Sequence, residues 1–192
     1  MTSYFGYISG ICIVLSFLPY LISMFAGKTK PERASWLIWS ILGGIAFFSQ
    51  LAKGAGSSLW LPGVQTCGDL LIFVLAIRYG MGGFAKRDRW GLAVAAMSLI
   101  LWYVTHEAAV ALILAIIMDA SGAVLTVMKA YEHPATEPIT AWILTMLGAL
   151  CAIFAVGSWN WILLIFPLYS FIGNAVIVAS IRLGKRGVMS AS

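Results

Sequence analysis

The sequence predicts an all-α integral membrane protein with seven transmembrane helices in a 3+1+3 arrangement. Of its 192 residues, 61% are hydrophobic and 10% are charged, and the mean hydropathy is +0.96. Soluble domains are about 25% charged, and a soluble fold of this length has too little interior for so much apolar surface. Three runs, 1–27, 34–52 and 138–181, contain no Asp, Glu, Lys or Arg. These runs are continuous instead of alternating, which favours helices of about 20 residues over barrel strands.

Polar breaks between the apolar runs delimit the spans. The breaks are a charged turn at 27–33, a Gly- and Ser-rich turn at 54–58, a charged loop at 80–89 and a proline-containing loop at 132–138. Proline stops a helix because it lacks a backbone donor, and glycine favours turns. The predicted spans are 3–26, 35–53, 60–79, 90–105, 108–131, 139–157 and 161–182.

The basic residues predict the orientation of these spans. The first run, 1–27, contains no Lys or Arg and so lacks the basic start of a signal peptide. We therefore interpret it as a retained span. With the N-terminus outside, every Lys and Arg except Lys53 falls on the cytoplasmic side. We therefore expect a protein of the plasma or inner membrane, embedded in the lipid bilayer, with a cytoplasmic C-terminus. The net charge of +5 lies in membrane-flanking loops, so no nucleic acid is expected as a partner.

The two halves of the chain share a Pro-x5-Gly-Asp/Asn pattern. Residues 62–69 carry it in the first half and residues 167–174 in the second, and the same alignment pairs Glu32 with Glu137. One span lies between the two triplets of spans, so both triplets have the same orientation. The predicted organisation is a three-helix repeat at 3–79, a linker helix at 90–105, a second repeat at 108–182 and a cytoplasmic tail at 183–192.

A local motif accompanies this plan. The segment Ser16-Phe17-Leu18-Pro19-Tyr20-Leu21 precedes the basic turn Lys28-Thr29-Lys30 and then Ser35. It resembles the PQ-loop pattern, in which a proline-glutamine pair precedes a basic turn and a serine. Together with the parallel repeat, the chain resembles the SWEET and PQ-loop transporter superfamily. Two departures are Tyr20 in place of glutamine and Val124-Leu125 where the second half would repeat the proline. The related PnuC-type vitamin transporters share the plan and favour Trp in their site, which points to Trp36 and Trp39.

Polar residues inside the spans are the candidate binding residues. The resemblance implies that Asp69 and Asn174 face the substrate. Asp69 and Asp119 are also the ionisable groups near mid-span, where a carboxylate costs about 2.5–3.5 kcal/mol on insertion scales. The alternative is a neutral, protonated Asp that ties two helices together. Polar neighbours on the same helix faces complete the set of candidate binding residues. The alternative for each serine is a hydrogen bond within its own helix. The full set is Asp69, Asn174, Asp119, Gln65, Ser121, Ser170 and Trp39.

Three prolines inside the predicted spans, Pro19, Pro62 and Pro167, are candidate hinges. Gly122 is a fourth candidate, because it lies near the place where the second half lacks its proline. Each proline can equally form a static kink.

The sequence contains no enzyme signature. It has no His pair at metal spacing, no Gly-rich phosphate loop and no Ser-His-Asp set, so we expect neither catalysis nor a metal or cofactor. A retinal pigment is excluded because residues 161–181 contain no lysine. We expect a transporter, either a facilitator or a proton-coupled carrier, that moves a small polar metabolite by alternating access between the two repeats. The alternative is a non-transporting seven-helix receptor or assembly protein of the same fold. A homo-oligomer is open in either case.

Overall fold

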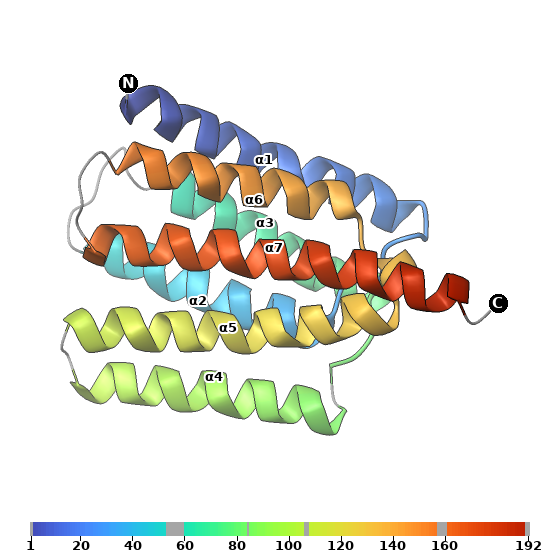
Figure 1. The fold of residues 1–192 in the computed structure, drawn as a ribbon. Coiled ribbons are helices and arrows are strands. Elements are labelled where there is room, and N and C mark those ends of the chain that lie inside the picture. Colours follow the sequence, from blue (N-terminus) through green and yellow to red (C-terminus); the bar gives the residue numbers. More distant parts are fainter. Residues whose placement is uncertain (1, 53–59, 84, 106–107, 157–160, 191–192) are drawn as a thin grey trace. The chain divides into compact units, whose positions relative to one another are not determined.

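The structure is a computed structural model that describes residues 2–52, 60–83, 85–105, 108–156 and 161–190 (Figure 1). Within these residues the chain forms helices and no strand, which confirms the predicted all-α class. The helices follow the predicted spans in order: α1 (Thr2–Phe25), α2 (Arg33–Ala52), α3 (Trp60–Tyr79), α4 (Lys86–Thr105), α5 (Ala108–Glu132), the short 3-10 helix η2 (Pro134–Thr136), α6 (Ile139–Ala155) and α7 (Trp161–Ser190).

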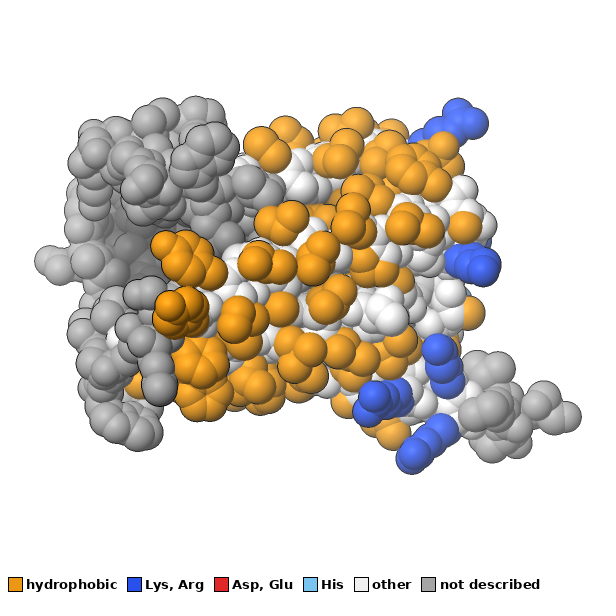
Figure 2. All heavy atoms as spheres, turned by 90° about the horizontal axis from the view of Figure 1, so that it is seen from above, with side chains coloured by type: hydrophobic (Ala, Val, Ile, Leu, Met, Phe, Trp, Pro, Cys, Tyr) orange, Lys and Arg blue, Asp and Glu red, His pale blue; other side chains and the backbone are white. Residues whose placement is uncertain are grey.

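Two of the described helices are long and apolar enough to cross a membrane. They are Tyr4–Phe25 in α1 and Pro167–Arg186 in α7, and α6 is a shorter apolar helix. Large apolar side chains such as Ile22, Ile77 and Val104 are exposed on the described helices. On the face that Figure 2 draws, hydrophobic side chains cover most of the described surface, and Lys and Arg side chains lie toward one end of it. The described helices therefore present much of their apolar surface outward.

The helices group into two packing units, each of which is described by itself. The first unit comprises Met1–Thr29 and Val127–Ser192, and the second comprises Lys30–Thr126. A packing unit groups helices by contact, whereas a repeat groups them by sequence symmetry. The predicted repeat boundaries therefore stay a prediction.

In the first unit, α6 packs against both α1 and α7 (Figure 1). Phe5 packs on Phe154 with ring centroids 5.6 Å apart, and Tyr20 meets Trp142 edge to face at 6.1 Å. Because the early residue of α1 meets the late residue of α6, the two helices are antiparallel. Gly148 of α6 lies at the centre of this contact.

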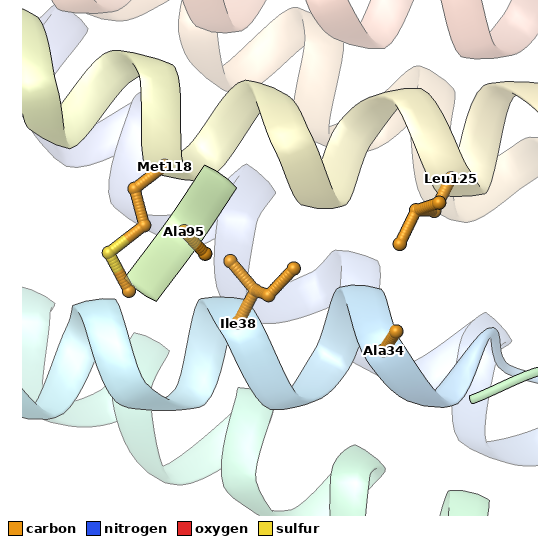
Figure 3. Close-up of a cluster of buried hydrophobic side chains, with 5 residues drawn as sticks. All are labelled: Ala34, Ile38, Ala95, Met118 and Leu125. Carbon is orange, nitrogen blue, oxygen red and sulfur yellow. The ribbon is translucent and has the colours of Figure 1, made fainter. Parts of the chain in front are cut away.

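In the second unit, α2 is the central helix. It packs against α3 and α4, and hydrogen bonds described below join it to α5. Figure 3 shows side chains of α2 facing those of α5 across a buried apolar cluster. The cluster consists of Ala34, Ile38, Ala95, Met118 and Leu125.

Two helix ends differ from the predicted spans. α4 begins at Lys86 instead of 90, inside the predicted charged loop, because Asp88 accepts hydrogen bonds from the Gly83 and Ala85 amides at its start. α7 continues past 182 to Ser190, because Ile181 and Gly184 pack inward while the charged side chains between and after them stay exposed. A charged residue ends a membrane span without ending a helix.

Gly148→Leu should lower the thermal stability of the purified protein. A Cβ at Gly148 would lie 3.0 Å from Ile13 Cγ1 and 3.2 Å from the Ser9 carbonyl oxygen, and overpacking of this kind costs about 1–3 kcal/mol. Gly6→Leu is the matched control on α1, because a Cβ there has no neighbour within 4 Å. Thermal unfolding in detergent measures both variants. Equal melting temperatures would contradict the close α1–α6 contact.

Candidate functional site

The second unit brings a polar group together around Asp69 of α3. Asp69 is 6% exposed, and Gln65, one turn earlier, donates from Nε2 to Asp69 Oδ1 at 3.2 Å. Asp119 of α5 is near enough for the two carboxyl groups to interact electrostatically. Sequence reasoning named all three residues, and the structure places them in one unit.

Trp39 of α2 belongs to the same group. Its indole Nε1 donates to the carbonyl oxygen of Asp119 at 3.3 Å, and its ring meets that of Trp36 edge to face, with centroids 5.1 Å apart. The bond attaches Trp39 to the helical turn that carries Asp119. Trp39 therefore lies against the turn of α5 that carries Asp119.

Gly122 allows α5 to approach α2 closely. A Cβ at this position would lie 3.1 Å from Trp39 Nε1 and 3.4 Å from the Ser35 carbonyl oxygen. α5 is continuous through Gly122, so in this structure the glycine makes a helix contact, and its role as a hinge stays a prediction. Nearby Ser121 donates from Oγ to the Met118 carbonyl oxygen at 2.6 Å, which is the bond within its own helix expected from the alternative interpretation.

Ser35 is a contact residue that sequence reasoning did not place in the site. Its Oγ lies 2.6 Å from the Gly122 carbonyl oxygen and 2.9 Å from Glu32 Oε2, and its single hydroxyl proton can bond to one of them at a time. Thr126 donates from Oγ1 to Ser35 Oγ at 2.9 Å. The PQ-loop-like pattern in the sequence includes Ser35, but it does not predict which residues Ser35 contacts.

The first unit contains the other two predicted binding residues, Asn174 and Ser170, both on α7. Asn174 donates from Nδ2 to the Ser170 carbonyl oxygen at 2.8 Å. Its Oδ1 is buried and has no hydrogen-bond donor among the described residues. Beside it, one face of α7 is hollowed into an open apolar surface, lined by Ile165, Leu168, Tyr169, Ile172 and Gly173.

The predicted hinge prolines have different settings. Pro19 and Pro167 lie inside α1 and α7, where each removes one backbone hydrogen bond. Pro62 is the third residue of α3, where its missing donor has no partner in the helix anyway. A hinge at Pro62 would therefore lie at the start of the helix and not within it.

A buried ion pair lies at the start of α6 in the first unit. Lys129 Nζ contacts Glu137 Oε1, and both side chains are fully buried. Trp142 donates from Nε1 to Glu137 Oε2 at 2.7 Å, so both carboxylate oxygens have a donor. Sequence reasoning treated Lys129 as a cytoplasmic flanking charge. The pairing of Glu32 with Glu137 in the two halves was the signal that an acid matters here.

Arg33 joins the start of α2 to the end of α3 and to the loop that follows α3. Its Nε donates to the Ala76 carbonyl oxygen at 2.8 Å, its Nη1 to that of Gly82 at 3.0 Å, and its Nη2 to that of Gly80 at 2.7 Å. These carbonyls are at and beyond the end of α3, where helix oxygens lack intrahelical partners. Arg33 therefore caps α3 from the neighbouring helix.

Among the residues that the structure describes, no group of three or more His, Cys, Asp or Glu side chains is arranged to hold a metal ion. Comparisons of the chain with models of protein families, with curated proteins and with solved structures give no match.

Lys129→Met should destabilise the protein by about 3–5 kcal/mol, because it leaves the buried Glu137 carboxylate without its counter-charge. The double variant Lys129→Met/Glu137→Gln should recover part of the loss, since no charge is then left unpaired. Chemical or thermal unfolding of the wild type, both single variants and the double variant measures this coupling. Additive losses in the double variant would rule out the pair as a coupled unit.

Proposed function

We propose that this chain is an integral membrane carrier with seven transmembrane helices in a 3+1+3 arrangement, which moves a small polar solute by alternating access. The outward apolar surface supports the membrane part of the proposal. Monomeric soluble proteins rarely expose such large apolar areas, whereas lipid accommodates exposed side chains such as Ile22, Ile77 and Val104. Neighbouring helices that fail a strict length and hydropathy test can still span a bilayer when they line a polar path.

The observation that carries the proposal is the setting of Asp69. It lies nearly fully buried in α3, next to a second acid, Asp119. Among the described residues its one hydrogen-bond donor is Gln65. Residues 34–52, 60–77 and 90–128 contain no Lys or Arg, so these stretches of the chain supply no basic partner for the Asp69 carboxyl group. Ionisable residues within membrane spans often mark solute and proton pathways, and we infer this role for Asp69.

Asn174 supports the same proposal from the second predicted repeat. Its Nδ2 is held by the helix, but the buried Oδ1 has no donor among the described residues. A buried acceptor without a partner costs free energy, about 1–3 kcal/mol. A solute that donates a hydrogen bond to Oδ1 would recover this cost. Asp69 and Asn174 thus each offer an acceptor to a solute that carries N–H or O–H groups.

Flux measurements test this function. We expect Asp69→Ala and Asn174→Ala each to reduce uptake at least about tenfold in proteoliposomes, the equivalent of about 1.4 kcal/mol in binding or barrier. The probes are radiolabelled glucose, a set of amino acids, thiamine and nicotinamide riboside, first screened with the wild type. Leu70→Ala and Val176→Ala are matched controls, because these neighbouring side chains are exposed and should leave flux unchanged.

Both possible failures are informative. Normal flux in the Asp69 and Asn174 variants would contradict the site while leaving transport intact. No flux of any probe through folded wild-type protein, together with no ligand-dependent thermal shift, would favour the alternative of a non-transporting receptor or assembly protein. A bound ligand must raise stability by RT ln(1 + [L]/Kd), so the thermal shift detects binding without transport.

Reporter fusions test the membrane arrangement separately. We expect a fluorescent protein fused after Ser192 to be fluorescent and alkaline phosphatase fused there to be inactive, because the basic loops keep the C-terminus in the cytoplasm. The same reporters fused after residue 56 should give the opposite result. Equal results at the two positions would contradict the predicted topology.

A further inference from the structure

A compact group of loop residues holds α2, α3 and α4 together at one end of the second unit. Met81 donates its amide to the Pro31 carbonyl oxygen at 2.9 Å, and Arg33 donates its amide to the Met81 carbonyl oxygen at 3.0 Å. The Arg33 guanidinium adds the bonds to the end of α3 described above. We call residues 31–33, 80–83 and 88 the clasp.

Glu32 lies inside the clasp and is 2% exposed. Its Oε2 accepts a hydrogen bond from the Ser35 amide at 2.6 Å. Its Oε1 is buried and has no donor among the described residues. This oxygen points at the Gly82 backbone, where a Cβ would lie 2.3 Å from it. Half of the Glu32 carboxyl group is therefore satisfied and half is not.

The charged groups around Glu32 do not neutralise it. Asp88 of α4 faces the same glycine, with its Oδ2 3.5 Å from the same Cβ position. That oxygen accepts the Gly83 amide at 2.6 Å, and Arg87 Nε lies 3.6 Å from the other oxygen of Asp88. The Arg33 guanidinium is bonded to carbonyl oxygens of and beyond α3. Two acids thus approach one turn, where Arg87 lies near Asp88 and the Arg33 guanidinium is bonded to carbonyl oxygens.

Burial, and to a lesser degree the charge of Asp88, raise the pKa of Glu32 above its ordinary value of 4.5, while bonds from Ser35 act in the opposite direction. The folded clasp therefore binds a proton at Glu32 more tightly than the open chain does. Stability from this proton is fully present below the ordinary pKa, and it is lost as the pH rises through the higher folded value.

We propose that Glu32 is a proton-binding site that controls the clasp. With the proton bound, Glu32 lies against Gly82 without repelling Asp88, and the two backbone bonds between residues 31–33 and Met81 persist. When the proton leaves to solvent, two buried carboxylates face the same turn, and the α3–α4 connection loosens. The proposal concerns these loops and does not depend on which solute the protein carries.

The corresponding acid of the other half provides a contrast. Glu137 is also buried, but Lys129 and Trp142 supply a donor to each of its oxygens. The Lys129 ammonium group thus offsets the charge of Glu137, as the proposed proton does at Glu32. Glu32 therefore lacks the basic partner that Glu137 has.

Hydrogen exchange of the full chain in lipid nanodiscs tests the proposal. The measured quantities are the protection factors of the Met81 and Gly83 amides from pH 5 to pH 9. A protection factor is a ratio to the intrinsic exchange rate, so the intrinsic pH dependence cancels. In the wild type these protection factors should fall about tenfold per pH unit between the pKa of Glu32 in the open clasp and its higher pKa in the closed clasp. In that range only the closed clasp holds the proton. Glu32→Gln should abolish this fall. Glu132→Gln, at an exposed acid at the end of α5, should preserve it.

The opposite results overturn the proposal. It fails if wild-type protection is flat across this range, or if Glu32→Gln follows the wild-type curve. Should Glu32→Gln not fold, Asp88→Asn replaces it, because an Asn side-chain oxygen can still accept an amide bond. Removing the Asp88 charge should move the midpoint of the fall to lower pH. An unchanged or higher midpoint would also overturn the proposal.

Discussion

The contact between Ser35 of α2 and the Gly122 carbonyl oxygen of α5 fixes how closely these two helices of the second unit approach each other. It is possible because Gly122 has no side chain to separate the helices. The same approach brings Trp39 within reach of the Asp119 carbonyl oxygen. It also closes the apolar cluster that Figure 3 shows. This close approach of two helices therefore places Trp39 against the turn that carries Asp119.

Two acids at corresponding positions of the halves are stabilised by different means. Glu137 forms a complete buried pair, in which each oxygen has a donor. Glu32 keeps one buried oxygen without a donor and faces Asp88. Removing water from a carboxylate is costly, and either a cation or a proton can offset that cost. The proposed proton site at Glu32 depends on this difference between the two acids.

The proposed carrier would combine static and responsive polar groups. Arg33 and Lys129 are engaged near the ends of helices, where they hold loops and helix starts together. Asp69 and Asn174 lie within helices and retain acceptor capacity. A carrier needs both kinds of group, because its ends must hold the helices while its interior must exchange partners. The placement of polar residues along the helices is consistent with this division.

Much of the fold followed from the sequence, because apolar runs and the residues that break them act locally. The class and order of the helices were predicted, and so was the shared face of Gln65 and Asp69, since helical periodicity alone sets that contact. α4 begins before its predicted span and α7 continues beyond its own, because a helix can extend outside an apolar run into charged residues.

The tertiary structure alone decided which helices meet. It placed α1 against α6, Arg33 on the end of α3, and Lys129 on Glu137 while leaving Glu32 without a base. No local pattern contains these choices, because a partner on another helix depends on how whole apolar surfaces and small residues such as Gly122 and Gly148 fit together. The sequence by itself thus determined the helices and their polar residues, and packing determined which of those residues became partners.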